Sequence, residues 1–293
     1  MPRPRAPQAA NNMTKRSRRF HLVLVLVLLS YAAVIGQTDI RKVDFKNFTF
    51  KAYCAGEAPE IVTVKNGEFS KETPMDGFID RFYFNVNSVS YGDLTGDGRD
   101  EAVVLTVCNT GGTGNFSEGF IYSVEAEKPK LVNRIAGGDR AYGGLRSASI
   151  ANGLLTIESN DPGELGASCC PESIITNQYR LRGGKLVEAA KSTTRPIYPT
   201  ERLAFARGTT GKTMTIKIAS DEGRRFVVGA RAGQQLIASI DSNKGSLRIL
   251  EDVEASFAPT SVTARLPKNG DYTVEIRNDS ASEMEFTLNI RIK

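Results

Sequence analysis

The stretch VSYGDLTGDGRDEAVVLTVC, residues 89–108, decides how this chain folds. It begins as an alternating strand, passes through a polar turn rich in Asp and Gly, and resumes as the apolar run 102–107. Two strands joined by a tight polar turn are typical of an antiparallel sheet. Asp and Gly at this spacing either bind a hard cation or close the turn through hydrogen bonds between Asp side chains and the backbone. The oxygen-bearing side chains of the turn are Asp93, Thr95, Asp97, Asp100 and Glu101.

The same alternation continues on both sides of this stretch, and no window of useful length repeats at the helical period. The dipeptides Asn66-Gly67, Asn152-Gly153 and Gly183-Gly184 mark turns between strands. A slip in the alternation between Val86 and Val89 indicates a β-bulge. The predicted strand segments of this part are residues 44–53, 60–70, 81–91, 119–125, 130–135, 147–150, 154–159, 173–181 and 185–187, and the segment 60–70 is expected to fold back at Asn66-Gly67.

A change in composition divides the chain after residue 190. Residues 191–200, KSTTRPIYPT, form a Pro-containing connector, and no Cys lies beyond it. The remaining residues alternate densely, with turns about ten residues apart, which is the pattern of a β-sandwich or jelly roll. We therefore predict an all-β fold with two β domains, an antiparallel domain with disulfides over residues 37–190 and an eight-stranded sandwich over 201–293. The strands predicted for the sandwich are residues 203–206, 212–219, 225–230, 235–241, 246–251, 261–266, 272–278 and 283–292.

Residues 1–36 have the three parts of a secretory signal, namely a basic segment, a short apolar core and the small residues Ala32, Ala33 and Gly36. The apolar core is shorter than the ~20 residues that a spanning helix needs. We therefore expect cleavage near Gly36, a periplasmic or secreted protein, and no stable membrane span after cleavage. An uncleaved N-terminal anchor is the alternative.

The basic composition of the chain comes from this N-terminal segment. Six Lys and Arg residues and no acid precede residue 22, and without them the formal charge of +5 becomes −1. The charge therefore indicates no surface for nucleic acid.

Histidine chemistry is absent from the expected mature protein, because His21 is the only His of the chain and lies in the signal. This excludes Ser-His-Asp and Cys-His nucleophiles and His-ligated zinc. A hydrolase using Asp93, Asp97 or Asp100 with a metal is the remaining catalytic alternative. Proton transfer needs two carboxyls in different environments, whereas these share one exposed turn. We therefore expect a protein that is not an enzyme.

Four cysteines, Cys54, Cys108, Cys169 and Cys170, predict two disulfides in an exported protein. Adjacent residues are only ~3.8 Å apart at their Cα atoms, which is short for a disulfide. We therefore expect Cys169 and Cys170 each to pair with Cys54 or Cys108, in an order left open. A redox or metal role for the Cys169-Cys170 pair is the alternative.

Two stretches of the second domain carry a family resemblance. FVVGARAGQQLIASIDS, residues 226–242, and LPKNGDYTVEIRN, residues 266–278, resemble the β-sandwich of periplasmic inhibitors of goose-type lysozyme and of pre-peptidase C-terminal domains. In the inhibitor family a loop of type SGxY is associated with reaching the lysozyme cleft. The positions that match it are Asn269, Gly270, Asp271 and Tyr272, with Asn in place of Ser. The resemblance implies a partner site there, and the competing interpretation is a turn followed by a core Tyr.

The turn described first also has relatives. GDLTGDGRDEAVV, residues 92–104, resembles the calcium loops of FG-GAP and VCBS-type repeats. The resemblance implies calcium bound by Asp93, Thr95, Asp97, the Arg99 carbonyl and Glu101. Thr95 stands where Asp or Asn is usual, and Val104 stands where an EF-hand has its bidentate Glu. A metal-free turn held by Asp hydrogen bonds is the other interpretation.

Two Gly-rich loops are too long to be mere connectors. They are residues 109–118, NTGGTGNFSE, and residues 137–144, GGDRAYGG, which carries Asp139, Arg140 and Tyr142. Neither is a phosphate loop, since both lack the GxxxxGK[ST] pattern and precede strands. Loops on a rigid β scaffold are typical of a recognition face. Plain connecting loops, in which Gly serves only the turn conformation, are the competing interpretation. The sequence thus favours an exported, non-catalytic binding protein for a protein or a cell-wall polysaccharide, with a lysozyme as one alternative partner.

Overall fold

The structure is a computed structural model that describes residues 39–293 except 55, 57, 165 and 168. Within these residues the chain is built from strands, with two short 3-10 helices as its helical elements. The prediction of an all-β fold is confirmed. No helix in these residues is long and apolar enough to span a membrane. The predicted secretory signal, residues 1–36, lies outside the described residues.

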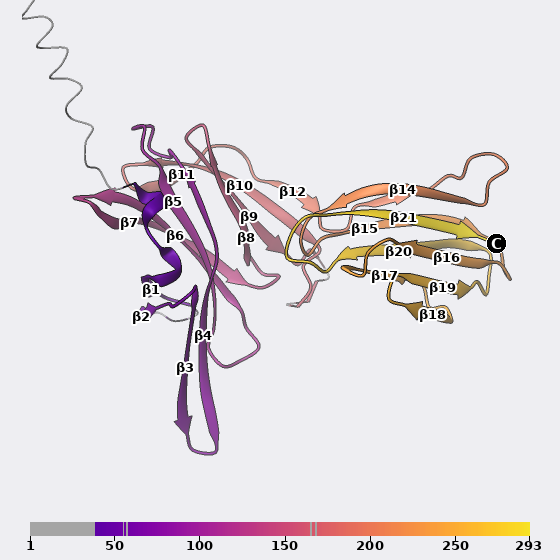
Figure 1. Cartoon of the computed structure of the whole chain (residues 1–293), viewed down its shortest axis with the longest axis horizontal. Coiled ribbons are helices and arrows are strands. Elements are labelled where there is room, and N and C mark those ends of the chain that lie inside the picture. Colours follow the sequence, from indigo (N-terminus) through magenta and orange to yellow (C-terminus); the bar gives the residue numbers. More distant parts are fainter. Residues whose placement is uncertain (1–38, 55, 57, 165, 168) are drawn as a thin grey trace, which may run out of the picture.

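The elements follow one another along the chain as Figure 1 shows. The first part contains η1 Ile40–Lys42, η2 Phe45–Asn47, β1 Thr49–Ala52, β2 Glu60–Thr63, β3 Glu68–Met75, β4 Phe78–Gly92, β5 Glu101–Asn109, β6 Phe116–Glu125, β7 Lys128–Asp139, β8 Leu145–Ala151, β9 Leu154–Asp161, β10 Ser173–Arg182, β11 Lys185–Glu188 and β12 Thr193–Pro196. The second part contains β13 Thr200–Arg202, β14 Gly211–Ile218, β15 Gly223–Ala230, β16 Gln235–Ile240, β17 Gly245–Ile249, β18 Ala255–Ala258, β19 Ser261–Arg265, β20 Gly270–Asn278 and β21 Met284–Ile292.

Strand β5 is the centre of the first part, in the sheet β3-β4-β5-β6-β7. Its apolar run is buried on both faces of the sheet. Ala102 and Val104 pack in one core cluster with β1 and β2, whereas Val103 and Leu105 pack in a second with β8 and β9. Successive strand residues point to opposite faces, so one unbroken apolar run supports both layers.

The layer on the first face contains η1, η2 and the β1-β2 pair. Its core is aromatic, with Phe50 fully buried at 5.5 Å from the ring of Phe84 and 5.4 Å from that of Phe120. The layer on the second face is the antiparallel sheet β8-β9-β10-β11, in which β12 also pairs with β10. The first part is therefore a central sheet covered on both sides.

Several local details of the fold were predicted correctly. The register of β4 against β5 shifts between Val86 and Ser88, which confirms the predicted bulge. Asn152 and Gly153 have positive φ angles of 53° and 68°, as a tight hairpin turn requires. The prediction of a strand over 44–53 was wrong in its first half. Asp44 accepts a hydrogen bond from the Lys46 N–H at 3.0 Å and caps a 3-10 turn there.

The second part consists of two sheets, β13-β15-β20-β17 and β14-β21-β16-β19-β18. Apolar side chains from both sheets form one buried cluster, including Phe226 and Tyr272 of the first and Leu236 and Phe286 of the second. The strand predicted over 203–206 is instead an irregular segment that follows β13. Strand β18 was missed, because it is a four-residue edge strand that pairs with β19 alone.

The segment between the two parts contributes to both. Strand β12 pairs with β10, and β13 pairs in parallel with β15. Residues 193–202, which overlap the predicted connector, are thus hydrogen-bonded to a sheet on each side. Figure 1 shows the two parts joined end to end through this region.

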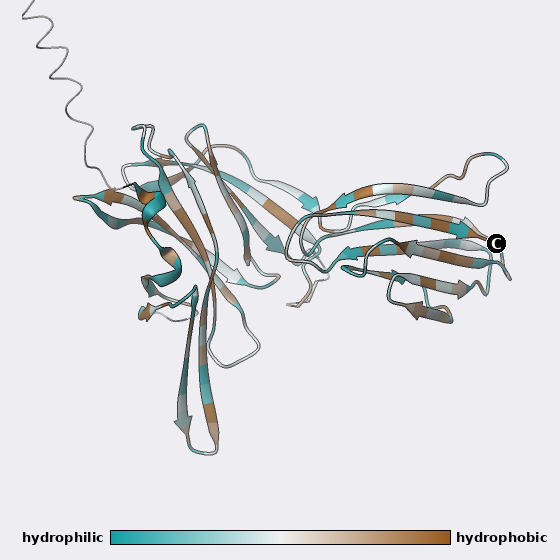
Figure 2. Cartoon of the chain, viewed as in Figure 1, coloured by the Kyte–Doolittle hydropathy of each residue, from teal (hydrophilic) through white to brown (hydrophobic). Residues whose placement is uncertain are grey.

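The β3-β4 hairpin extends beyond the sheet that carries it. Strand β4 pairs with β5 only from Tyr83 onward, so its first residues pair with β3 alone. The hairpin projects from the body (Figure 1) and is apolar near its tip (Figure 2). Met75, Phe78 and Ile79 are each at least half exposed there.

Candidate functional site

The acidic turn, residues 93–101, is held by its own side chains. The Asp93 carboxylate accepts hydrogen bonds from the Gly96 N–H at 2.6 Å and the Gly98 N–H at 2.9 Å. Both glycines have positive φ, 80° and 82°, which glycine adopts without steric cost. The spacing of Asp and Gly in the sequence thus corresponds to a turn that closes on Asp93.

Glu101 anchors the end of the turn at the first residue of β5. It is buried, and its Oε2 accepts hydrogen bonds from the N–H groups of Leu94 at 2.8 Å and Thr95 at 3.0 Å. Burial raises the pKa of Glu101, although these two hydrogen bonds oppose the shift. Glu101 therefore acts as an internal brace of the turn.

The other two carboxylates of the turn pair with arginines. Asp97 accepts hydrogen bonds from the Arg99 side chain, and these lower the pKa of Asp97. Asp100 accepts from Arg41 Nε at 2.6 Å, which ties the turn to η1. Each carboxylate of the turn thus has a protein partner.

The donor set fits calcium in kind, because it consists of oxygen atoms. An ion at this turn would have to displace Arg99 from Asp97. Within the described residues, three metal-ligating side chains come within 4.8 Å of one another only at Cys54, Cys108 and Glu118, where the sulfurs form a disulfide. Calcium at the acidic turn and a metal-free turn both stay predictions.

Two clefts flank the acidic turn. The larger, about 900 Å³, is lined by the turn, η1, the β6-β7 hairpin and the β10-β11 turn. Its walls carry both signs of charge, including Arg41, Glu125 and Lys130. The smaller, about 680 Å³, is lined by Arg180 and Arg182 together with the β8-β9 turn.

The two Gly-rich loops lie together at another place on the first part. Asp139 accepts hydrogen bonds from the Asn115 N–H at 2.7 Å and from Arg140 Nε at 3.0 Å. Partial burial raises the pKa of Asp139, but the hydrogen bonds from Arg140 and Asn115 outweigh it and lower the pKa overall. Asp139 is therefore an ionised link between the loops 109–118 and 137–144.

Close backbone packing explains the glycines of the second loop. A Cβ atom at Gly138 would overlap the Tyr142 carbonyl, and one at Gly144 would overlap the Arg140 carbonyl. The Arg140 carbonyl also accepts a hydrogen bond from the Asn160 side chain at 2.9 Å. The loop is thus a compact structure fastened to β9.

Tyr142 is the exposed aromatic residue of this loop. Its side chain is 52% exposed, and its hydroxyl donates to the Gly166 carbonyl at 3.3 Å. Arg140 and Asp139 are partly buried beside it. The loops therefore present an aromatic side chain on a rigid support, an arrangement suited to binding.

The four residues that match the SGxY loop differ in burial. Asn269, Gly270 and Asp271 are exposed, whereas Tyr272 is 1% exposed within the sandwich core. The Tyr272 hydroxyl donates to the Lys268 carbonyl at 2.7 Å, and the Asn269 side chain accepts from the Ala232 N–H. Tyr272 in this position packs the sandwich and stabilises the turn.

The predicted disulfide pairing was wrong. Cys54 pairs with Cys108, with Cα atoms 5.8 Å apart, and Cys169 pairs with the adjacent Cys170. Cys54 follows β1, which covers the face of the central sheet where Cys108 is buried. Strands β8 and β9 cover the opposite face, so the β9-β10 loop that carries Cys169 and Cys170 is separated from Cys108 by the sheet.

Glu118 was not predicted as a structural residue. It is 3% exposed and accepts hydrogen bonds from the Tyr53 N–H at 2.7 Å, from the Cys54 N–H and from Arg134 at 2.7 Å. The Arg134 guanidinium also lies over the Tyr53 ring. An acid in the middle of a buried strand is the sequence signal that marks such a residue.

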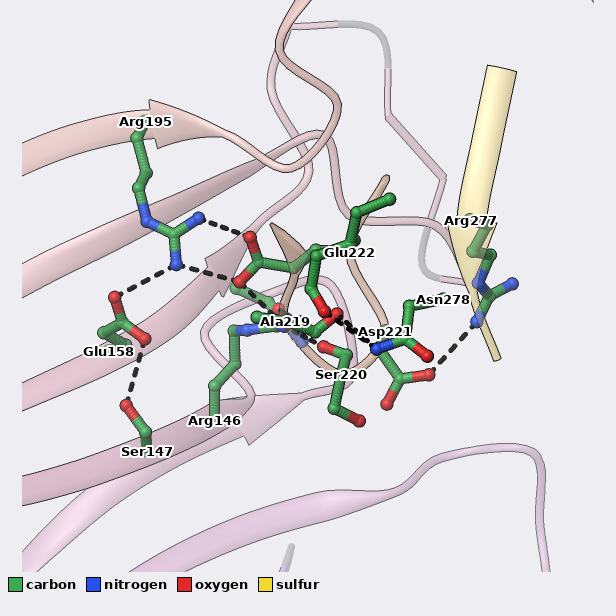
Figure 3. A network of polar contacts seen from close by, with 12 residues as sticks. Arg146, Ser147, Glu158, Arg195, Ala219, Ser220, Asp221, Glu222, Arg277 and Asn278 are labelled. Carbon is green, nitrogen blue, oxygen red and sulfur yellow. Dashed lines mark hydrogen bonds and ion pairs between the residues drawn. The ribbon is translucent and has the colours of Figure 1, made fainter. Parts of the chain in front are cut away.

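A polar network joins the two parts of the chain (Figure 3). Glu222, which precedes β15, accepts from both Nη atoms of Arg195 at 2.7 and 2.8 Å. Arg146 of β8 lies 3.5 Å from the same carboxylate and donates to the Ser220 carbonyl. Arg195 also contacts Glu158 of β9 at 3.2 Å. The partners in this network are 27 to 76 residues apart in the sequence, so local sequence patterns could not predict their contacts.

Comparison with known proteins gives limited similarity. No family model matches the chain, and no curated protein matches it. Three similar solved structures are periplasmic lysozyme inhibitors of g-type lysozyme. They come from Aeromonas hydrophila (16% identity, TM-score 0.29, 33% of this chain and 97% of that chain), Salmonella Typhimurium (17%, 0.28, 32% and 98%) and, as a mutant, Escherichia coli (14%, 0.27, 33% and 98%). These values assign no activity to the chain.

Proposed function

We propose that the chain is an exported, non-catalytic binding protein whose recognition surface is formed by the loops 109–118 and 137–144. The observation that carries this proposal is the link between the loops. Asp139 joins them, close packing at Gly138 and Gly144 makes the second loop compact, and Tyr142 is exposed upon it. A rigid aromatic side chain loses little conformational entropy on binding, so it is an efficient anchor for a partner.

The contacts of the acidic side chains support a non-catalytic role. Asp93, Asp97 and Asp100 each have a backbone or arginine partner. The described residues contain no His, because His21 lies outside them. The geometry therefore offers binding surfaces and turn supports in place of an acid and base pair.

Export is part of the same proposal. It is supported by the signal-like residues 1–36 and by two disulfides, which form and persist in oxidising compartments. The partner that we propose is a protein or a cell-wall polysaccharide that the exported chain meets there.

The test compares two exposed aromatic residues. Wild type, Tyr142→Ala and Phe257→Ala are immobilised and exposed to periplasmic proteins and to purified cell-wall polysaccharide, and each retained component is then titrated. Phe257 is the control, since it is 67% exposed on β18. We expect Tyr142→Ala to weaken binding at least about tenfold, as for an aromatic anchor, and Phe257→Ala to leave it unchanged. Unchanged binding by Tyr142→Ala would reject the loop surface.

Inhibition of a g-type lysozyme is the second candidate function. The exposed residues Asn269 and Asp271 are the part of the matching loop that a partner can contact, and Asp271 pairs with Arg202. An inhibition assay with wild type and Asp271→Ala tests this function. If inhibition exists at this loop, Asp271→Ala weakens it while the melting temperature stays within about 1 °C, because exposed ion pairs stabilise little. Absence of inhibition at micromolar protein ends this alternative.

A further inference from the structure

The two disulfides of the chain lie in contrasting environments. Cys108 is 2% exposed in the aromatic core cluster, and Cys54 is partly buried against the same cluster. Cys169 and Cys170 are both exposed in the loop between β9 and β10. A soluble thiol can therefore approach the second pair directly, whereas the first is shielded.

The Cys169–Cys170 bond contributes little as a structural staple. A disulfide stabilises mainly by closing a loop of the unfolded chain, and the effect grows with the number of enclosed residues. Adjacent cysteines enclose none, whereas Cys54–Cys108 spans a sequence separation of 54. The Cys169–Cys170 bond is therefore not explained by a contribution to the stability of the fold. Its exposure instead indicates a reactive disulfide at the surface.

The loop that carries this bond contacts the recognition surface. The Gly166 carbonyl accepts the hydrogen bond from Tyr142, and the Ala167 carbonyl accepts one from the Cys170 N–H at 2.9 Å. At the base of the loop, the Glu172 N–H donates to the Asp161 carbonyl and the Ile197 N–H donates to the Glu172 carbonyl. The covalent ring of Cys169 and Cys170 therefore lies between a fixed base and the Tyr142 contact.

We propose that Cys169–Cys170 is a thiol–disulfide exchange site that accepts electrons from a dithiol. A thiolate of the dithiol attacks one exposed sulfur, breaks the Cys169–Cys170 bond and forms a mixed disulfide, while the other cysteine leaves as a thiolate and takes up a proton. The second thiol of the dithiol then attacks the mixed disulfide and releases the remaining cysteine. The dithiol becomes a disulfide, and the cysteine pair gains two electrons and two protons.

Reduction would also change the recognition surface, and this consequence rests on the proposed function. Opening the ring frees the backbone of Cys169 and Cys170 and loosens the segment that supplies the Gly166 acceptor to Tyr142. Binding through Tyr142 is then weaker in the reduced protein than in the oxidised one.

The exchange site is tested on the exported full chain under native conditions. The protein is titrated with dithiothreitol and alkylated with iodoacetamide, and the modified peptides are quantified by mass spectrometry. We expect Cys169 and Cys170 to be half-reduced at a concentration at least about tenfold below that needed for Cys54 and Cys108. Reduction of both pairs together overturns the proposal, as does alkylation of Cys169 and Cys170 without reductant.

A double variant separates this site from folding and from partner binding. Cys169→Ser with Cys170→Ser removes the early alkylation and leaves Cys54 and Cys108 as resistant as in wild type. Wild type binding is then measured before and after selective reduction. If reduction is selective but binding is unchanged, the exchange site stands and its link to the recognition surface is rejected. If binding itself fails in Tyr142→Ala and wild type alike, the proposed function is rejected independently of the exchange site.

Discussion

Glu101 illustrates how one buried carboxyl can shape a turn. Its Oε2 accepts from the N–H groups of Leu94 and Thr95, so the turn and the first residue of β5 are held together by a single atom. Burial raises the pKa of Glu101 above its ordinary value of 4.5. Above pH 4.5 the unfolded chain therefore loses this proton more readily than the folded chain, and stability falls until the pH exceeds the folded pKa.

Replacement of Glu101 by Gln is expected to reduce this pH dependence. The Gln amide oxygen can accept from both N–H groups, so the turn is retained while the ionisation is removed. Urea midpoints measured between pH 4 and pH 7 should fall less in Glu101→Gln than in wild type. Glu72→Gln serves as control, because Glu72 is exposed in its pair with Arg81. An identical slope in wild type and Glu101→Gln would contradict the assignment.

Tyr272 shows the limit of motif matching at the level of single residues. The dipeptide Asn269-Gly270 predicts a turn, and the chain bends at Lys268 and Asn269 before β20 begins at Gly270. Whether the following Tyr faces a partner or the core depends on the second sheet, which packs against it from residues distant in sequence. The burial of Tyr272 could therefore not be decided from its own loop.

At the scale of elements, the loop 137–144 depends on backbone contacts that exclude side chains. Gly138→Ala is expected to distort this loop, because its Cβ would overlap the Tyr142 carbonyl. Gly112→Ala in the neighbouring loop is the matched control, since its Cβ meets open space. Hydrogen exchange of the Gly143 and Gly144 amides, together with the melting temperature, measures the effect. We expect a loss of about 1–3 kcal/mol in Gly138→Ala and less than about 0.5 in the control.

The contacts of the acidic turn predict how calcium affects the stability of the protein. Its carboxylates already accept from backbone N–H groups, Arg99 and Arg41. We therefore expect millimolar calcium to leave the melting temperature unchanged, because an ion has to displace existing partners. Asp97→Asn is the matched variant, since an ion would need this carboxylate. A rise in the melting temperature of wild type that Asp97→Asn abolishes would instead establish a calcium site.

Elements were predicted best where the signal is local. Alternation and the turn dipeptides identified most strands and the β4 bulge, because side-chain period and turn conformation are set by neighbouring residues. The two Gly-rich loops were recognised individually, but their link through Asp139 and Asn115 spans 24 residues. The disulfide pairing depended on which face of the central sheet each loop reaches. Neither the Asp139–Asn115 link nor the disulfide pairing can be predicted from neighbouring residues in the sequence.

At the scale of the whole molecule, Glu222 connects the first part to the sandwich. Its carboxylate lies between Arg195 of β12 and Arg146 of β8, and its side chain is 13% exposed. The hydrogen bonds to Glu222, together with Glu158, raise the pKa of Arg195. Removing Glu222 takes away the carboxylate that lies 3.5 Å from Arg146 and leaves Arg195 paired with Glu158 alone. Breaking a shielded ion network in this way costs more than one ion pair contributes.

Glu222→Ala is therefore expected to weaken the coupling between the two parts. We expect a loss of roughly 1–3 kcal/mol, below the value for fully buried pairs because the Arg195 side chain is 42% exposed. Calorimetry should show the single transition of a coupled molecule broaden or divide, and small-angle scattering should show a larger radius of gyration. Glu72→Ala on the projecting hairpin is the control, since it removes an exposed partner of Arg81 far from the junction. If Glu222→Ala melts and scatters as Glu72→Ala does, the strand pairs of β12 and β13 alone hold the two parts together.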